Sequence, residues 1–130
     1  MEVAQLLELY GQGHRNFANI DLSNAELRNV SLTGIDLRGS TLNKADLSSA
    51  NLIEANLIES DFTGAILKGA NLRGTNLRGA ILQNLTACED TEFTGVRNLD
   101  ERTRLYLCTI ACGMHPFTKN NSRQTLDCLN

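Results

Sequence analysis

The sequence predicts an all-β solenoid: a parallel β-helix with four-sided coils and a helix at each end. Leu or Phe recurs every five residues through more than half of the chain, and a small or β-branched residue mostly stands two positions earlier. Polar residues and glycines fill the other three positions. A five-residue period matches neither an α-helix nor a simple strand. It fits a coil in which each side is five residues long.

Fourteen five-residue blocks fill residues 15 to 84. If four blocks close one turn, equivalent blocks stack at the strand spacing of about 4.8 Å. The central Leu or Phe of each block then points inward, together with the small residue before it, and glycine at the fifth position suits a turn with positive φ. The predicted core residues are Phe17, Leu22, Leu27, Leu32, Leu37, Leu42, Leu47, Leu52, Leu57, Phe62, Leu67, Leu72, Leu77, Leu82 and Phe93.

The period is interrupted once, after Leu82. Phe93 follows eleven residues later instead of ten, so the segment LTACED carries one extra residue before TEFTG resumes the pattern. We interpret LTACED as a bulged side of the last coil.

Blocks such as ADLSS, ANLIE, SDFTG and ANLRG resemble the pentapeptide-repeat family, whose consensus is A-(D/N)-L-x-x. The resemblance covers residues 15 to 95 and implies a right-handed quadrilateral β-helix, here of about four coils. It divides the chain into an N-terminal cap helix (1–14), the β-helix (15–95) and a C-terminal helical cap (96–130). Such caps are needed because a solenoid exposes apolar core and unpaired backbone at both ends.

The N-terminal segment has the spacing of an amphipathic helix. Val3, Leu6, Leu7 and Tyr10 lie on one helical face, and Gly11 marks the end of the helix. We expect this helix to cover the first coil.

The C-terminal segment predicts a longer helix and a short one. Asn98 and Glu101 have the spacing of a capping box, and Gly113 and Pro116 stop the first helix. A second helix would follow Asn121 or Ser122. The first helix carries two apolar stripes, so we expect it to pack on two sides: Leu107, Ile110, Ala111 and Met114 on one, and Leu105, Cys108 and Cys112 on the other.

The chain has four cysteines, and their pairing is open from spacing alone. Cys108 and Cys112 share the helix face expected to meet Cys128, so either could form a disulfide with it. A reducing compartment would instead keep all of them as thiols. The C-terminal segment also resembles a cap of some cyanobacterial pentapeptide-repeat proteins in which the first and last cysteines pair, and this resemblance implies the bond Cys108–Cys128.

A metal site is a further alternative for these cysteines. Cys108, Cys112 and His115 lie at positions i, i+4 and i+7, with Cys128 as a fourth ligand. The segment lacks the short C-x-x-C spacing usual in structural zinc sites. Gly113 also interrupts the helix before His115, so we expect neither a metal nor another cofactor.

The sequence shows no catalytic constellation. The glycines are single and spaced for turns, not for a phosphate loop, and the carboxylates occupy outward positions on different sides. A net charge of −3 argues against nucleic-acid binding, and no apolar stretch reaches the roughly 18 residues of a membrane span. We therefore expect a protein that is not an enzyme and that binds an unidentified protein partner.

Two rows of outward residues are candidate contact surfaces. Arg38, Ile58 and Arg78 stack at one outward position, with Asp36 and Glu59 nearby. The adjacent row is formed by Thr33, Ile53 and Arg73.

Resemblance to the family suggests one alternative function, because some members modulate DNA gyrase by imitating duplex DNA. Those members are strongly acidic along the column. Residues 15 to 95 here carry ten acidic and seven basic side chains, and the basic ones interrupt every acidic stripe. The charge pattern therefore disfavours mimicry of DNA.

Two further expectations concern the state of the protein in the cell. Caps at both ends would leave no free sheet edge, which predicts a monomer. The N-terminus lacks the basic and apolar regions of a secretory signal, which predicts a cytoplasmic protein if Met1 is the natural start. A disulfide would make the periplasm or the thylakoid lumen the alternative compartments.

Overall fold

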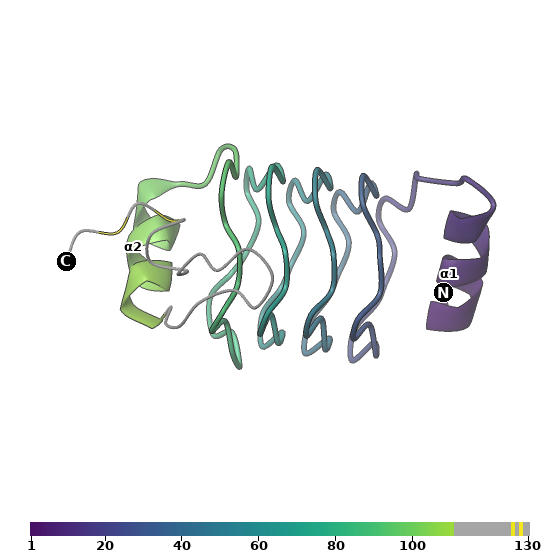
Figure 1. Ribbon diagram of the computed structural model, residues 1–130, viewed down its shortest axis with the longest axis horizontal. Coiled ribbons are helices and arrows are strands. Elements are labelled where there is room, and N and C mark those ends of the chain that lie inside the picture. Colours follow the sequence, from purple (N-terminus) through teal and green to yellow (C-terminus); the bar gives the residue numbers. More distant parts are fainter. Residues whose placement is uncertain (111–125, 127, 129–130) are drawn as a thin grey trace.

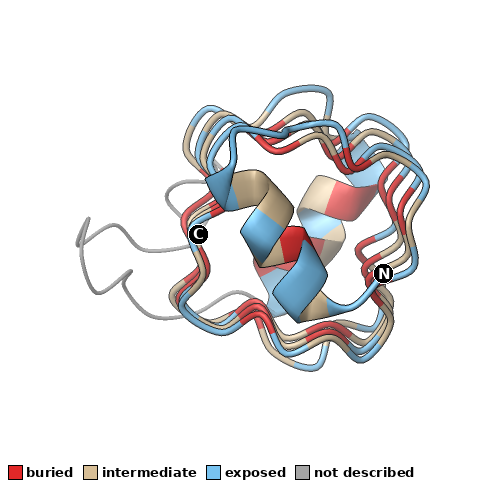
Figure 2. Cartoon of the chain, turned by 90° about the vertical axis from the view of Figure 1, so that its right-hand side faces the viewer, coloured by how far each residue is buried: buried red, intermediate tan, exposed pale blue. Residues whose placement is uncertain are grey.

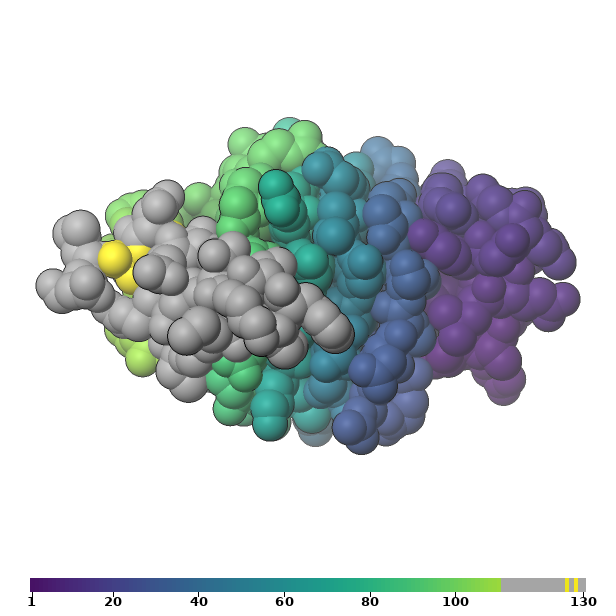
Figure 3. All heavy atoms as spheres, viewed as in Figure 1, coloured from purple at the N-terminus to yellow at the C-terminus, as the bar shows by residue number. Residues whose placement is uncertain are grey.

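The computed structural model describes residues 1–110, 126 and 128 of the 130-residue chain. Helix α1 (Val3–Gly11) lies at one end of a column of stacked coils, and helix α2 (Glu101–Ile110) lies at the other end (Figure 1). In the space-filling view the coils form parallel rows of atoms across the column surface (Figure 3).

Parallel β-bridges stack the coils. Each bridge joins residues 20 positions apart, from Asn16–Asp36 through to Asp61–Ile81. These are isolated bridges and not long strands, because a corner follows each central residue within two positions. The bridging residue points outward between two buried positions, which is why the sequence places Asp, Asn, Ser or Thr there so often.

The bridges define four sides, which we name by their central residues. All of these residues are buried, with at most 4% of any side chain exposed. Side A has Phe17, Leu37, Leu57 and Leu77; side B has Leu22, Leu42, Phe62 and Leu82; side C has Leu27, Leu47, Leu67 and Cys88; side D has Leu32, Leu52, Leu72 and Phe93.

Each corner of the column has the same backbone geometry. The fifth residue of a block adopts positive φ, whether it is glycine (Gly39, φ 66°) or not (Lys44, φ 59°; Glu59, φ 57°). Its N–H donates to the carbonyl of the next coil, as Asn19 does to Arg38 at 2.8 Å. The side chain of the bridging Asp or Asn accepts the N–H two residues later, which fixes the corner; Asn56 accepts from Ile58 at 3.2 Å.

The extra residue after Leu82 disturbs a shorter segment than the sequence indicated. The bridge Asp61–Ile81 keeps the spacing of 20, and the next bridge, Ile66–Ala87, has a spacing of 21. The extra residue therefore falls between them, and the pattern resumes at Ala87 instead of at TEFTG. Cys88 takes the central inward position of side C and is 3% exposed, so it occupies a kind of position that the sequence analysis assigned to Leu and Phe alone.

Helix α1 packs on the first coil through the predicted face. Leu6 is fully buried, and Val3, Leu7 and Tyr10 are partly buried against the core. Tyr10 also donates its hydroxyl hydrogen to the carbonyl oxygen of Thr33 at 2.6 Å. The guanidinium of Arg15 lies 3.8 Å from the centre of the Tyr10 ring. A hydrogen bond and a cation–π contact thus fix the angle at which α1 meets the column.

Helix α2 begins differently from the expected capping box. The carboxylate of Asp100, not the side chain of Asn98, accepts the N–H of Thr103, at 2.7 Å. Asp100 lies one residue before α2 and Thr103 is the third residue of the helix, which is the usual geometry of an N-cap. Thr103 also donates its hydroxyl hydrogen to the Asp100 carboxylate. The N–H bond, with the larger effect, and this hydroxyl bond hold the pKa of Asp100 below its ordinary value of 3.8.

The two predicted stripes of α2 are corrected in part. Leu107 and Cys108 are buried, one from each stripe. Leu105 is 53% exposed and Ile110 is 36% exposed, so neither stripe is buried along its described length. The predicted end of the helix at Gly113 and the predicted helix after Asn121 or Ser122 lie outside the described residues.

Candidate functional site

An open groove crosses four coils along the corner between sides A and B. Its volume is about 350 Å³, and its lining residues are Ala18, Asn19, Arg38, Gly39, Ile58, Glu59 and Arg78. Arg38, Ile58 and Arg78 hold the same position in successive blocks of side A. We call this hollow the Arg38–Arg78 groove. It includes the first of the two rows that the sequence indicated as contact surfaces.

The repeat produces this hollow by alternating long and short side chains. Half-buried Ile58 lies between two exposed arginines, so it forms the floor of the groove. Gly39 adds depth because it has no side chain, and a Cβ there would collide with the amide oxygen of Asn19. The positive φ of Gly39 (66°) also disfavours any side chain at this position.

One arginine of the groove is fixed. The Arg38 guanidinium contacts the Asp36 carboxylate at 2.8 Å and makes further hydrogen bonds of 3.0 and 3.1 Å to it. Burial of Asp36 is the largest single influence on the pKa of its carboxyl and raises it. The hydrogen bonds and the charge of Arg38 together outweigh burial, so the pKa lies below its ordinary value. Asp36 is therefore ionised near neutral pH, and it holds Arg38 beside Ile58.

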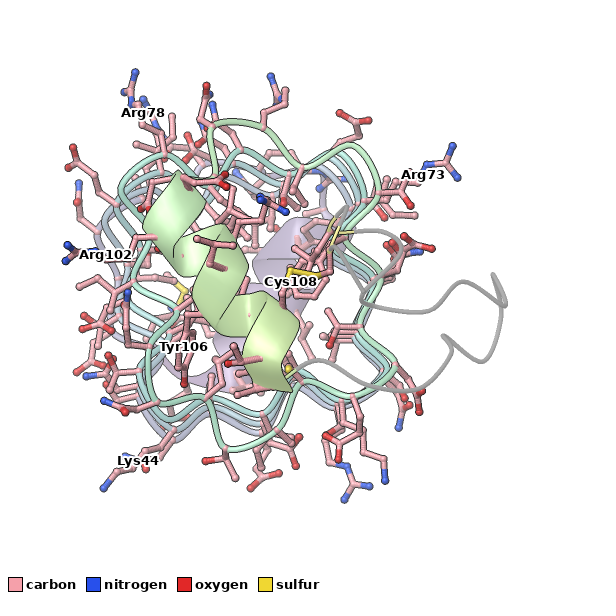
Figure 4. The ribbon with its side chains drawn as sticks, turned by 90° about the vertical axis from the view of Figure 1, so that its left-hand side faces the viewer. Lys44, Arg73, Arg78, Arg102, Tyr106 and Cys108 are labelled. Carbon is pink, nitrogen blue, oxygen red and sulfur yellow. A yellow bond between two sulfur atoms is a disulfide. The ribbon has the colours of Figure 1, made fainter. Side chains whose placement is uncertain are left out.

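The other arginine is available to a partner. Among the described residues no ion pair or side-chain hydrogen bond engages the guanidinium of Arg78; its backbone N–H bonds to Asn76 at 3.2 Å. Figure 4 shows Arg78 pointing outward at a different corner from Arg73. The groove thus offers an apolar floor between one neutralised and one free cation.

The second predicted row, Thr33, Ile53 and Arg73, belongs to side D and does not line this groove. Ile53 matches Ile58 closely, since both are half-buried and both donate their N–H to the amide oxygen of an Asn two residues earlier. The sequence could not show which of the two rows lies in a groove, because the groove is formed by side chains from coils 20 residues apart.

The structure joins Cys108 to Cys128 by a disulfide, with the two Cα atoms 5.7 Å apart. This is the pair implied by the family resemblance. Cysteines in a disulfide cannot act as thiolate ligands, and Cys112 and His115, the other residues of the metal hypothesis, lie outside the described residues. Within residues 1–110, 126 and 128, no group of three or more metal-ligating side chains occurs.

Comparison with known proteins identifies the family. The sequence pattern of pentapeptide repeats matches residues 14–43 and 45–84, which is more than half of the chain. The chain therefore belongs to the pentapeptide-repeat family, and this membership implies the right-handed quadrilateral β-helix. No curated protein sequence matches the chain significantly.

Two solved structures are similar over most of the chain. One is a pentapeptide-repeat protein of the Arabidopsis thaliana thylakoid lumen, with 29% identity and a TM-score of 0.66 over 85% of this chain and 90% of that one. The other is HetL of the cyanobacterium Nostoc sp. strain PCC 7120, a protein involved in the regulation of heterocyst differentiation. Its identity is 34% and its TM-score 0.65 over 75% of this chain, which spans 47% of HetL.

Neither of the two helices is both long enough and apolar enough to cross a membrane, as far as the described residues go.

Proposed function

We propose that this chain is a non-catalytic protein-binding module and that the Arg38–Arg78 groove is its contact surface. The observation that carries the proposal is the groove itself: an apolar floor with a free arginine, on a column whose interior is filled by side chains. Membership of the pentapeptide-repeat family, whose proteins are generally structural or binding proteins, supports a non-enzymatic role.

The geometry of the column favours recognition of a surface. Hydrogen bonds between successive coils hold the rows of outward residues, so a partner meets side chains whose spacing is set before binding. Preorganisation of this kind reduces the entropy that is lost on association. Arginine is also one of the residue types that contribute most often to the binding energy of protein interfaces.

Imitation of duplex DNA, the alternative function, finds less support. A DNA-like surface needs continuous negative charge along the column. In this chain Arg38 and Arg78 stand at the corner that also carries Glu59, and Arg28 pairs with Asp46 on side C at 3.7 Å. The acidic residues are thus interspersed with basic ones on the surface where mimicry would require an uninterrupted row.

The test replaces the groove floor and uses a matched control. Ile58→Asp places a carboxylate in the groove, and Ile53→Asp makes the same change at the equivalent position of side D. Both variants are used as bait, and the captured proteins are identified by mass spectrometry. We expect Ile58→Asp to lose the partner that the native chain and Ile53→Asp retain.

The reverse pattern, loss with Ile53→Asp and retention with Ile58→Asp, would move the contact surface to side D. Capture of the same proteins by both variants would remove the groove from the proposal. Circular dichroism melts of both variants ensure that a loss of binding does not reflect unfolding.

A further inference from the structure

The first coil has a free β-edge on its N-terminal side. In the rest of the column, each coil accepts and donates hydrogen bonds in a fixed pattern. On side B, Leu22 N–H donates to Thr41 O at 2.7 Å, Asn24 N–H donates to Asn43 O at 2.8 Å, and Thr41 N–H donates to Ile20 O at 3.0 Å. The first coil has no coil beneath it, so its equivalent groups need another partner.

Helix α1 supplies little of what is missing. It lies across the middle of the square end and covers the core, while the backbone of the first coil passes around it (Figure 2). Among the described residues, its one hydrogen bond to a backbone group of this edge is from the Tyr10 hydroxyl to Thr33 O, on side D. The bridging residues of the first coil (Asn16, Asp21, Glu26 and Ser31) are all exposed, whereas their counterparts in the second coil are half-buried.

Side B is the side best suited to receive another strand. On side A the chain enters the coil at Arg15, whose guanidinium bonds to Tyr10 O and His14 O. Side C carries the exposed cation Arg28, and side D is engaged by Tyr10. On side B, residues 20–24, four backbone groups have no partner among the described residues. Three of them, Asp21 N–H, Asp21 O and Ser23 O, are groups of the kind that pair between coils, and the fourth is the corner carbonyl of Asn24.

The charge of this end specifies the occupant. Glu2, Glu8, Asp21 and Glu26 are all exposed, and none of them belongs to an ion pair within the described part of the chain. Two positive charges, the α-amino group of Met1 and the guanidinium of Arg15, stand against these four negative ones, while Arg28 of the first coil pairs with Asp46 of the second. A second copy of this chain would bring the same carboxylates against themselves, and like charges at an interface are unfavourable.

We propose that side B of the first coil binds a basic, extended segment of another protein by parallel strand addition. The segment would continue the hydrogen-bond pattern of the column: two of its N–H groups donate to Asp21 O and Ser23 O, and one of its carbonyls accepts from Asp21 N–H. Its Lys or Arg side chains face Asp21 and Glu26. Main-chain pairing with an exposed sheet edge is a recurrent mode of peptide recognition.

This surface is separate from the Arg38–Arg78 groove, and the proposal does not rest on the function proposed for the groove. It also changes the basis of the predicted monomer. Side B of the first coil keeps unpaired backbone groups, so the expectation that capping leaves no free sheet edge does not hold there, and the monomer stays a prediction.

The probe is the peptide acetyl-Lys-Val-Lys-Val-Lys-amide, titrated into the isotope-labelled full chain and followed by NMR. We expect shifts of the amide signals of Asp21 and its neighbours, and slower hydrogen exchange at Asp21 N–H. Methylating the nitrogens of alternate residues leaves one edge of the peptide able to pair, so binding should persist. Methylating every backbone nitrogen blocks both edges and should weaken binding at least about tenfold, as expected for the loss of several backbone hydrogen bonds.

Charge is tested with variants of the protein. Asp21→Asn combined with Glu26→Gln should weaken binding about threefold to tenfold, and the effect should fall with added salt. Glu54→Gln, an exposed acid in the second coil of side D, is the matched control and should leave the affinity unchanged.

Three outcomes would overturn the proposal. Equal binding of the fully methylated peptide would show that only charge attracts it. Shifts in the Arg38–Arg78 groove without shifts at Asp21 would place the peptide elsewhere. No shift at Asp21 with the peptide in the millimolar range would show that the edge does not pair.

Discussion

The two ends of the column meet the same problem in opposite ways. On each side two N–H groups of one coil donate to carbonyls of the next coil and one bond runs the other way. The first coil must therefore satisfy mainly carbonyls, and the last mainly N–H groups, through groups outside the column. At the α1 end, Tyr10 donates its hydroxyl hydrogen to Thr33 O at 2.6 Å. At the α2 end, the hydroxyl oxygen of Tyr106 accepts the N–H of Asn84 at 3.0 Å, and in Figure 4 Tyr106 lies on the side of α2 nearer the corner with Lys44.

The ends differ in how many bonds support the helix. At the N-cap of α1, Glu2 makes no side-chain hydrogen bond, whereas Asp100 caps α2 through Thr103. Arg104 of α2 also bonds to the carbonyl of Leu126 at 3.1 Å, and the disulfide joins Cys108 of the same helix to Cys128. Attachment of α1 therefore depends mostly on apolar packing, while α2 has polar and covalent support as well.

The largest expected effect is at the α1 end. Leu6→Ala removes a fully buried side chain from the contact with the first coil, and we expect a loss of about 2–5 kcal/mol in the free energy of unfolding. Urea denaturation measures it. The control is Leu105→Ala in α2, which should change stability by less than about 0.5 kcal/mol because Leu105 is 53% exposed. A large effect of Leu105→Ala would restore the second apolar stripe that the sequence predicted.

Reduction of the disulfide should act on the α2 end alone. The bond closes a loop of 20 residues, which is worth about 3 kcal/mol in the chain-entropy model. Because each coil contacts its neighbours and not the distant end, we expect faster hydrogen exchange in α2 and at Leu126 and no change in the first coil. The oxidised protein is the control. Loss of protection along the whole column on reduction would contradict this separation.

The two tyrosines provide a symmetric test. Tyr10→Phe and Tyr106→Phe each delete one hydroxyl and leave one backbone group without its partner, so each should cost about 0.5–1.5 kcal/mol. The double variant should show additive losses within about 0.5 kcal/mol, because the sites are far apart and share no partner. Thermal or urea melts of the three variants suffice. Strong coupling between the two would mean that the ends communicate through the column.

The smallest effects concern the two helix starts. Asp100→Ala should cost about 1 kcal/mol at neutral pH, the usual value of an N-cap, whereas Glu2→Ala should be nearly neutral. The pKa of Asp100 is lowered in the folded protein, so its carboxylate stabilises the fold above pH 3.8 and this contribution is lost as the pH falls through the folded pKa. The free energies of unfolding of the wild type and of Asp100→Ala should thus converge in acid. A constant difference down to pH 2 would show that the charge of Asp100 has no part in the cap.

The sequence predicted the column well because its period is a local property of side chains. Every fifth residue from Phe17 to Leu82 is buried. The polar residues at the outward positions follow the same period, which is visible without any tertiary information. The sequence did not reveal the roles of Tyr10 and Tyr106, because their hydrogen bonds join residues 23 and 22 positions apart. Spacing within one helix cannot indicate which backbone group a distant coil leaves unpaired.

The same limit applies to the site and to the shift at Cys88. The sequence placed Arg38, Ile58 and Arg78 in one row, but the groove also needs the Asn19 side chain over Gly39 and the bond from Asp36 to Arg38. The register of Cys88 could not be read because either Leu85 or Cys88 has the size of a core residue. The bridge Ile66–Ala87 resolves this ambiguity in favour of Cys88.

The constant spacing of the bridges below Ile66–Ala87 makes the height of this protein adjustable in whole steps. Residues 35–54 form one complete turn, and each bridge that they make with the turn below or above has the same spacing of 20. Inserting a second copy of this segment would move α1 and α2 about 4.8 Å further apart without changing what either helix contacts. A series of such insertions would turn the molecule into a ruler, in which the distance between two binding surfaces is set by the number of turns between them.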